Sequence, residues 1–332
     1  MKRIISAAAA FAAALSLMTG CGSNSSSSND KGTSSKQLSI VCTIFPEYDW
    51  VNQILGSHTD SAEITYLLDN GVDLHSYQPT ADDMIKISSC DMFIYVGGES
   101  DEWVEDALDD AQNKNMQVVD LMEVMGDSAK EEEVKEGMEA EEEEVKEGME
   151  AEEEEEVEYD EHVWLSLRNA KTICTEIESR LEIIDPANAD DYKANLASYT
   201  AELDKLDGEF KSVVDGASTK TVLFGDRFPF RYFADDYGLD YYAAFVGCSA
   251  ETEASFETVV FLANKVDELG LGTVFTIENS DGKIAQTIID NTEDKNAQIL
   301  TLNSLQSVTA ADGETYLSVM QENLETLKKA LL

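Results

Sequence analysis

The sequence predicts an α/β protein of two lobes, each a parallel β-sheet with flanking helices. In both halves of the chain, short apolar runs typical of buried strands alternate with helical segments, and that alternation is characteristic of parallel sheets. Between the halves, residues 190–214 form one long amphipathic segment, which we expect to be a helix of about 40 Å that bridges the lobes. The chain of 332 residues is long enough for two domains.

The N-terminus has the pattern of a secretory signal. Two basic residues at positions 2 and 3 precede an apolar run over residues 4–18, and small residues lead to Cys21. This run is too short for an ordinary membrane span, and its end resembles a bacterial lipobox, with Met18 in place of the commoner leucine. We therefore interpret residues 1–20 as a signal peptide and Cys21 as the lipid attachment site. Plain secretion with a free Cys21 is the alternative.

Residues 21–36 are rich in Ser, Asn and Gly and are expected to be a flexible tether. The first lobe is assigned to residues 37–184. Its strands are expected at residues 38–45, 62–68, 91–96 and 116–121, and its helices at 46–54, 81–88, 102–113 and 167–183.

An acidic insertion, residues 127–159, interrupts the first lobe. Between Glu131 and Glu161 the chain carries 19 acidic residues and two lysines, and a Val-Lys-Glu-Gly-Met-Glu-Ala segment occurs twice, from Val134 and from Val145. Like charges at this density repel and resist compaction, so we expect a disordered or loosely helical segment. It could serve as a solvated spacer or gather cations.

The linking helix, assigned to residues 185–216, is followed by a second lobe over residues 217–332. Strands are expected at 221–224, 239–245, 273–277 and 298–302, and helices at 230–237, 255–269, 283–291 and 314–331. Neither half contains a GxGxxG or Walker A loop, so a nucleotide-binding enzyme is unsupported.

Charge and cysteine spacing restrict the function further. The formal net charge of −45 argues against nucleic-acid binding and suits an extracytoplasmic protein that attracts cations. Cysteines at positions 42, 90, 174 and 248 show no CxxC spacing, so buried free thiols are the default interpretation.

Two of the three histidines stand in loops of the first lobe. His75 lies between a strand and a helix, and His162 follows the acidic insertion. Loops at one edge of a sheet can converge, and neutral imidazole is a common metal ligand. His58 is interpreted as a surface residue.

The chain resembles the bacterial metal-binding solute-binding proteins of ABC importers for zinc and manganese, and the resemblance covers nearly the whole chain. It rests on the lipobox and on the segments at residues 71–80, 91–97, 161–165, 185–189 and 316–324. The family fold has two lobes of parallel sheet joined by a long rigid helix, with the metal site in the cleft between the lobes.

The resemblance implies a ligand set, carried over residue by residue. His75 and His162 match the two metal histidines of the first lobe. The third family ligand falls at Arg227, which cannot bind a cation, so its neighbour Asp226 is the candidate, with a helix cap or a partner of Arg227 as its alternative roles. The fourth ligand is best matched by Asp281, with Glu278 and Glu253 as further candidates.

The implied function is capture of a divalent transition metal, with Zn²⁺ favoured over Mn²⁺, and its delivery to the membrane permease of an ABC importer. The protein would be a monomer held at the outer face of the membrane by lipid on Cys21. A metal-dependent hydrolase and a surface adhesin are the alternatives, although no HExxH motif supports the hydrolase.

Overall fold

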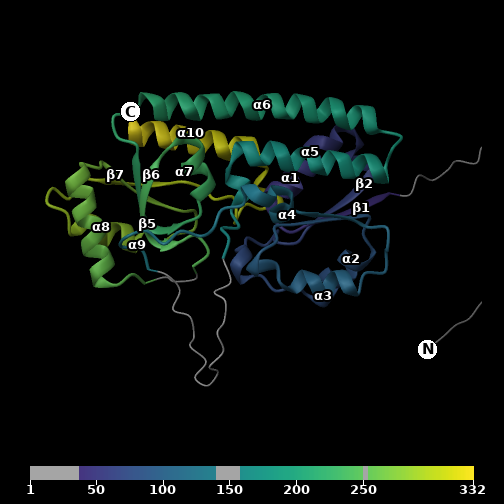
Figure 1. Cartoon of the computed structure of the whole chain (residues 1–332), viewed down its shortest axis with the longest axis horizontal. Coiled ribbons are helices and arrows are strands. Elements are labelled where there is room, and N and C mark those ends of the chain that lie inside the picture. Colours follow the sequence, from purple (N-terminus) through teal and green to yellow (C-terminus); the bar gives the residue numbers. More distant parts are fainter. Residues whose placement is uncertain (1–36, 140–157, 250–252) are drawn as a thin grey trace, which may run out of the picture. The chain divides into compact units, whose positions relative to one another are not determined.

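A computed structural model describes residues 37–139, 158–249 and 253–332 of the chain. Within these ranges, two four-stranded sheets organise the fold. Figure 1 shows them with their flanking helices. All strand pairs are parallel. The strand order is β2-β1-β3-β4 in the first lobe and β6-β5-β7-β8 in the second, so the two sheets repeat one topology. The predicted fold class is confirmed. The strands are β1 (Leu38–Cys42), β2 (Ala62–Tyr66), β3 (Met92–Tyr95), β4 (Gln117–Asp120), β5 (Thr221–Phe228), β6 (Asp240–Val246), β7 (Thr273–Thr276) and β8 (Gln298–Thr301).

Several helices bury an apolar face and begin with a polar side chain that caps the first turn. Ser166 caps α5 and Ser255 caps α8 by accepting backbone N–H groups of the first turn. The helices are α1 (Phe45–Leu55), α2 (Ala81–Ser89), α3 (Trp103–Asp109), α4 (Leu121–Met125), α5 (Leu167–Ile184), α6 (Ala189–Gly216), α7 (Arg231–Tyr237), α8 (Phe256–Leu269), α9 (Lys283–Asp290) and α10 (Tyr316–Leu331).

Helix α6 is the long element that connects the lobes. Its 28 residues span about 42 Å. It packs against α1 and α5 of the first lobe and against α7 and α10 of the second, as Figure 1 shows. One hydrophobic core lies beneath it and includes residues of both lobes, from Ile40 to Leu327.

Buried side chains also join the lobes directly. The Tyr316 hydroxyl donates to the Trp164 carbonyl at 2.7 Å, and the Trp164 indole N–H donates to the Ser304 carbonyl at 2.8 Å. The Tyr66 hydroxyl donates to the Val308 carbonyl at 2.8 Å. These bonds satisfy aromatic polar groups inside the core and fix how the second lobe meets the first.

Strand β5 is longer than the predicted 221–224 and continues through Asp226 and Arg227 to Phe228. The apolar pattern ends at Phe224, yet the backbone pairs again with β6 after an irregularity between Phe224 and Arg227. Strand β5 therefore carries two charged residues at its carboxyl end.

The first part of the acidic insertion differs from the disordered or loosely helical segment that we predicted. Residues 130–139 lie along β6, which is the edge strand of the second sheet. The Glu139 N–H donates to the Ala244 carbonyl at 2.9 Å, Lys135 pairs with Asp240 at 2.6 Å, and Met138 packs against the core. Composition alone misses this docking because its partners are on β6, about 105 residues further along the chain.

Other predictions fall outside the described ranges. These are the signal peptide at 1–20, lipid attachment at Cys21, the tether at 21–36 and the part of the insertion at 140–157. Within the described ranges, no helix is both long and apolar enough to cross a membrane.

Candidate metal centre

His75 is held by the loop that follows β2. It lies in a short 3₁₀ turn, Leu74–Ser76, where the Asp73 carboxylate accepts the His75 backbone N–H at 3.1 Å and Leu74 is buried. Its Nδ1 atom lies 2.7 Å from the Ser100 hydroxyl. The Ser100 N–H in turn donates to Glu161 at 2.9 Å. These contacts occupy the Nδ1 atom of His75 and leave its Nε2 atom to face the ring of His162.

His162 is held in the same way from a different segment. The Asp160 carboxylate accepts the His162 backbone N–H at 2.8 Å and lies 3.0 Å from its Nδ1 atom. The side chains of both residues are almost completely buried. A carboxylate on the second ring nitrogen is the usual support of a metal-binding histidine, because it fixes the ring and its tautomer.

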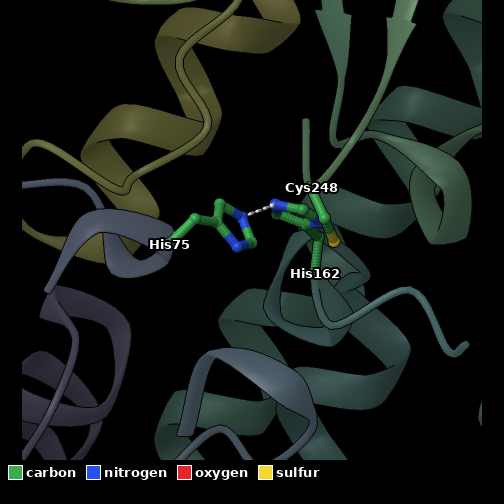
Figure 2. Close-up of side chains that lie close together, drawn as sticks. All are labelled: His75, His162 and Cys248. Carbon is green, nitrogen blue, oxygen red and sulfur yellow. Dashed lines mark hydrogen bonds between the residues drawn. The ribbon is translucent and has the colours of Figure 1, made fainter. Parts of the chain in front are cut away.

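The two histidines present their remaining nitrogens to each other. Their Nε2 atoms are 3.2 Å apart. Figure 2 shows the two rings pointing toward each other from opposite sides. Burial, followed by the nearby His162, lowers the pKa of His75 to about 3, so this imidazole is neutral at pH 7. Neutral imidazole is the form that binds metal ions. The structure thus brings together His75 and His162, as predicted for a metal site.

Cys248 is the third member of this group, and we did not predict it. It follows β6, and its Sγ lies with the two histidine nitrogens so that all three atoms are within 4.8 Å of one another. No other group of three metal-binding side chains was found among the residues that the structure describes. Burial, together with the carboxylates of Asp160, Glu132 and Glu161, raises the pKa of the Cys248 thiol. The sequence signal that could have found it is its position directly after the end of β6.

Asp226 lies outside this group of three. On β5, its carboxylate accepts the Arg227 N–H at 3.0 Å and the Ile277 N–H at 3.4 Å, where β7 ends. It lines a cleft of about 520 Å³ that also includes Asp73 and Arg227.

Asp281 lines the same cleft but is exposed. Its carboxylate accepts the Lys283 N–H at 3.0 Å and pairs with the Lys283 ammonium. The assignment of Asp226 and Asp281 as ligands remains a prediction.

The structure also describes the two further ligand candidates, Glu278 and Glu253. Glu278 accepts hydrogen bonds from the Ser304 N–H, the Ser304 hydroxyl and the Gln306 N–H, so its carboxylate already holds the chain after β8. Glu253 is exposed. Arg227, where the resemblance predicts the third ligand to fall, forms an ion pair with Asp73 and so connects β5 to the His75 loop.

Comparisons with known proteins show which family and which solved structures this chain is similar to. The family described as "Zinc-uptake complex component A periplasmic" matches residues 40–330. The zinc-binding lipoprotein AdcA of Streptococcus pneumoniae (strain ATCC BAA-255 / R6) is 31% identical over 311 residues, which cover 91% of this chain and 57% of that protein. The high-affinity zinc uptake system protein ZnuA of Bacillus subtilis (strain 168) is 29% identical over 321 residues, covering 97% and 96% of the two chains.

Among solved structures, the Zn(II)-bound ZnuA-like domain of Streptococcus pneumoniae AdcA superposes with a TM-score of 0.67 at 28% identity, covering 89% of this chain and 99% of that domain. The chain spans about half the length of the streptococcal AdcA proteins that it matches.

Proposed function

The chain belongs to the zinc-uptake complex component A family, and on that premise we propose that it is an extracytoplasmic zinc receptor of an ABC importer. It would bind Zn²⁺ in the cleft through His75 and His162 and deliver the ion to a membrane permease. The metal is therefore the transported substrate and not a resident cofactor.

The observation that carries this proposal is the opposed pair of Nε2 atoms, 3.2 Å apart, each on a ring whose other nitrogen is already engaged. Two Zn–N bonds of about 2.0–2.1 Å at a tetrahedral angle place the nitrogens about 3.3 Å apart. The two rings are thus spaced for one zinc ion with little rearrangement.

The preference for zinc over manganese has a chemical basis. Imidazole suits Zn²⁺, whereas carboxylate and carbonyl oxygens suit Mn²⁺, and the general affinity order of divalent metals also favours zinc. The relatives described above are named for zinc binding or zinc uptake. On the basis of the family resemblance, we propose Asp226 and Asp281 of the second lobe as the candidates for the coordination positions that the histidines leave open.

Three further assignments concern the location of the protein, its oligomeric state and the absence of enzymatic activity. We propose that lipid on Cys21 anchors the chain to the outer face of the membrane, that it acts as a monomer, and that it has no enzymatic activity. The hydrolase and adhesin alternatives are not favoured, since the family is one of metal uptake.

Calorimetric titration of the metal-free full-length chain with Zn²⁺ and Mn²⁺ tests the proposal. We expect zinc to bind at micromolar concentration or below and more tightly than manganese. At 100 times the dissociation constant, zinc should stabilise the fold by about 2.7 kcal/mol and raise its melting temperature. Absence of zinc binding at micromolar concentration would contradict the proposal.

A genetic experiment tests the transport role. Deletion of the gene should impair growth at low zinc, and the wild-type chain should restore growth while the double variant His75→Ala/His162→Ala does not. Equal rescue by both chains would argue that this centre does not serve zinc uptake.

A further inference from the structure

Cys248 occupies a position in the second lobe that corresponds to that of His75 in the first. The two sheets repeat one topology, in which β2 and β6 are equivalent edge strands. His75 stands in the loop after β2, and Cys248 stands in the loop after β6. Since ligands in open α/β sheets bind beyond the carboxyl ends of the strands, this repeat directs one side chain from each lobe to the shared centre.

The distances suit a common metal ion. All three ligand atoms of His75, His162 and Cys248 lie within 4.8 Å of one another. Zn–S and Zn–N bonds of about 2.3 and 2.1 Å require S–N separations of about 3.6 Å in a tetrahedral site. The thiol therefore has to approach each nitrogen by at most about 1.2 Å to reach coordination range.

The backbone around Cys248 is fixed from several sides. The Cys248 N–H donates to the Glu132 carboxylate at 3.3 Å, and the next carbonyl, that of Ser249, accepts from Arg227 at 3.4 Å. Gly247 lies against the His162 ring, so closely that a Cβ there would be 3.2 Å from the ring nitrogen Nδ1. The absence of a side chain at Gly247 thus allows the Cys248 segment to approach His162.

Cys248 also differs from the other described cysteines. Cys42, Cys90 and Cys174 are completely buried and belong to hydrophobic clusters. Cys248 is partly exposed, belongs to none of the described clusters, and lies beside His162 (Figure 2). Packing explains the three buried thiols, but it does not explain a thiol beside two imidazoles.

We propose that Cys248 is a thiolate ligand of the transported metal, so that the receptor holds zinc through two nitrogens and one sulfur. This inference rests on the proposed function. On binding, Zn²⁺ displaces the thiol proton to solvent and forms a Zn–S bond, while a tetrahedral ion keeps one further position for a carboxylate or water. Because thiolates favour soft and borderline ions, Cys248 makes the receptor selective for Zn²⁺ and Cd²⁺ against Mn²⁺.

Cobalt substitution of the full-length chain tests the ligand directly. The Co²⁺-loaded wild-type chain should show a thiolate-to-cobalt charge-transfer band in the near ultraviolet. Cys248→Ser should lose this band, whereas the control Cys90→Ser, at a buried first-lobe cysteine, should keep it. In zinc titrations, Cys248→Ser should bind at least about tenfold more weakly and should discriminate less against Mn²⁺.

Alkylation of the wild-type chain provides a measurement that does not depend on a variant. Zinc should protect Cys248 from iodoacetamide, as read by mass spectrometry of its peptide. If the wild-type chain binds zinc but shows no charge-transfer band and no protection, the Cys248 proposal is overturned while the receptor function stands. If the wild-type chain does not bind zinc, the proposed function falls as well.

Discussion

The Nε2 atoms of His75 and His162 lie 3.2 Å apart although 87 residues separate the two histidines in the sequence. Each ring is fixed by a contact to its Nδ1 atom, from Ser100 in one case and from Asp160 in the other. The centre is therefore preorganised: the ring orientations that a metal requires are set by the fold before an ion binds.

Removal of either histidine should sharply weaken zinc binding. We expect His75→Ala and His162→Ala each to lower zinc affinity by more than about 100-fold, since loss of a supporting residue alone costs about 10–100-fold. His58→Ala is the matched control, because His58 pairs with Asp191 at 2.9 Å and is not part of the centre. Zinc titration by calorimetry measures all three. An unchanged affinity would remove that histidine from the site.

The two carboxylates predicted from the sequence can be tested in the same titration. If Asp226 and Asp281 bind the ion, Asp226→Asn and Asp281→Asn should each weaken zinc binding by about tenfold or more. Glu322→Gln serves as the control, because Glu322 is an exposed acidic residue on α10 of the same lobe and does not line the cleft. A variant that binds zinc like the wild type shows that its carboxylate contributes no bond.

Asp160 should act on affinity through His162 rather than by binding the ion. Asp160→Asn keeps the shape of the side chain but weakens the acceptor at His162 Nδ1, 3.0 Å away. We expect a 10–100-fold loss of zinc affinity with little change in the melting temperature of the metal-free chain. Asp204→Asn, an exposed position on α6, is the control. A loss of stability without a loss of affinity would assign Asp160 a purely structural role.

Glu47 should make the stability of the fold depend on pH. Burial, followed by the charge of Asp101, raises the pKa of Glu47 from 4.5 to about 8. The folded chain thus holds this proton more tightly than the unfolded chain does, so stability is lost as pH rises from about 5 to about 8. The effect is on the order of a few kcal/mol.

Urea unfolding of the metal-free chain at several pH values measures this dependence. Glu47→Gln should reduce it, with a remainder from groups such as Asp101, whose pKa burial raises to about 7. Glu63→Gln, at an exposed position, should leave it unchanged. Identical profiles for the wild type and Glu47→Gln would show that Glu47 does not carry the proton.

Gly137 should be required for docking of the insertion on the second lobe. Its φ of +86° is strained for other residues, and a Cβ there would lie 2.1 Å from the Phe261 ring. We expect Gly137→Ala to lower the free energy of unfolding by about 1–3 kcal/mol. Gly208→Ala is the matched control: Gly208 lies inside α6 with open space around it, so alanine there should add about 0.4–1 kcal/mol. Equal stability of Gly137→Ala and the wild type in urea would contradict the docking.

Local sequence patterns were sufficient for most of the architecture. Apolar runs such as residues 38–42 and 273–276 predict strands, because a parallel strand covered on both faces needs apolar side chains at successive positions. The long helix α6 could be predicted because its apolar residues recur with helical spacing. The two histidines could be proposed because both stand in loops of the first lobe and match the metal histidines of the family that the chain resembles.

Only the tertiary structure showed that Cys248 lies with the two histidines at the candidate metal centre. Cys248 resembles any other cysteine in the sequence, and its contact with the histidines exists only because β6 ends beside His162, with Gly247 allowing the close approach. The docking of residues 130–139 likewise depends on the free edge of β6. Sequence periodicity indicates which face of a segment is buried. A metal site depends instead on distances between segments that are far apart in the chain. These distances are set only when the two lobes pack together.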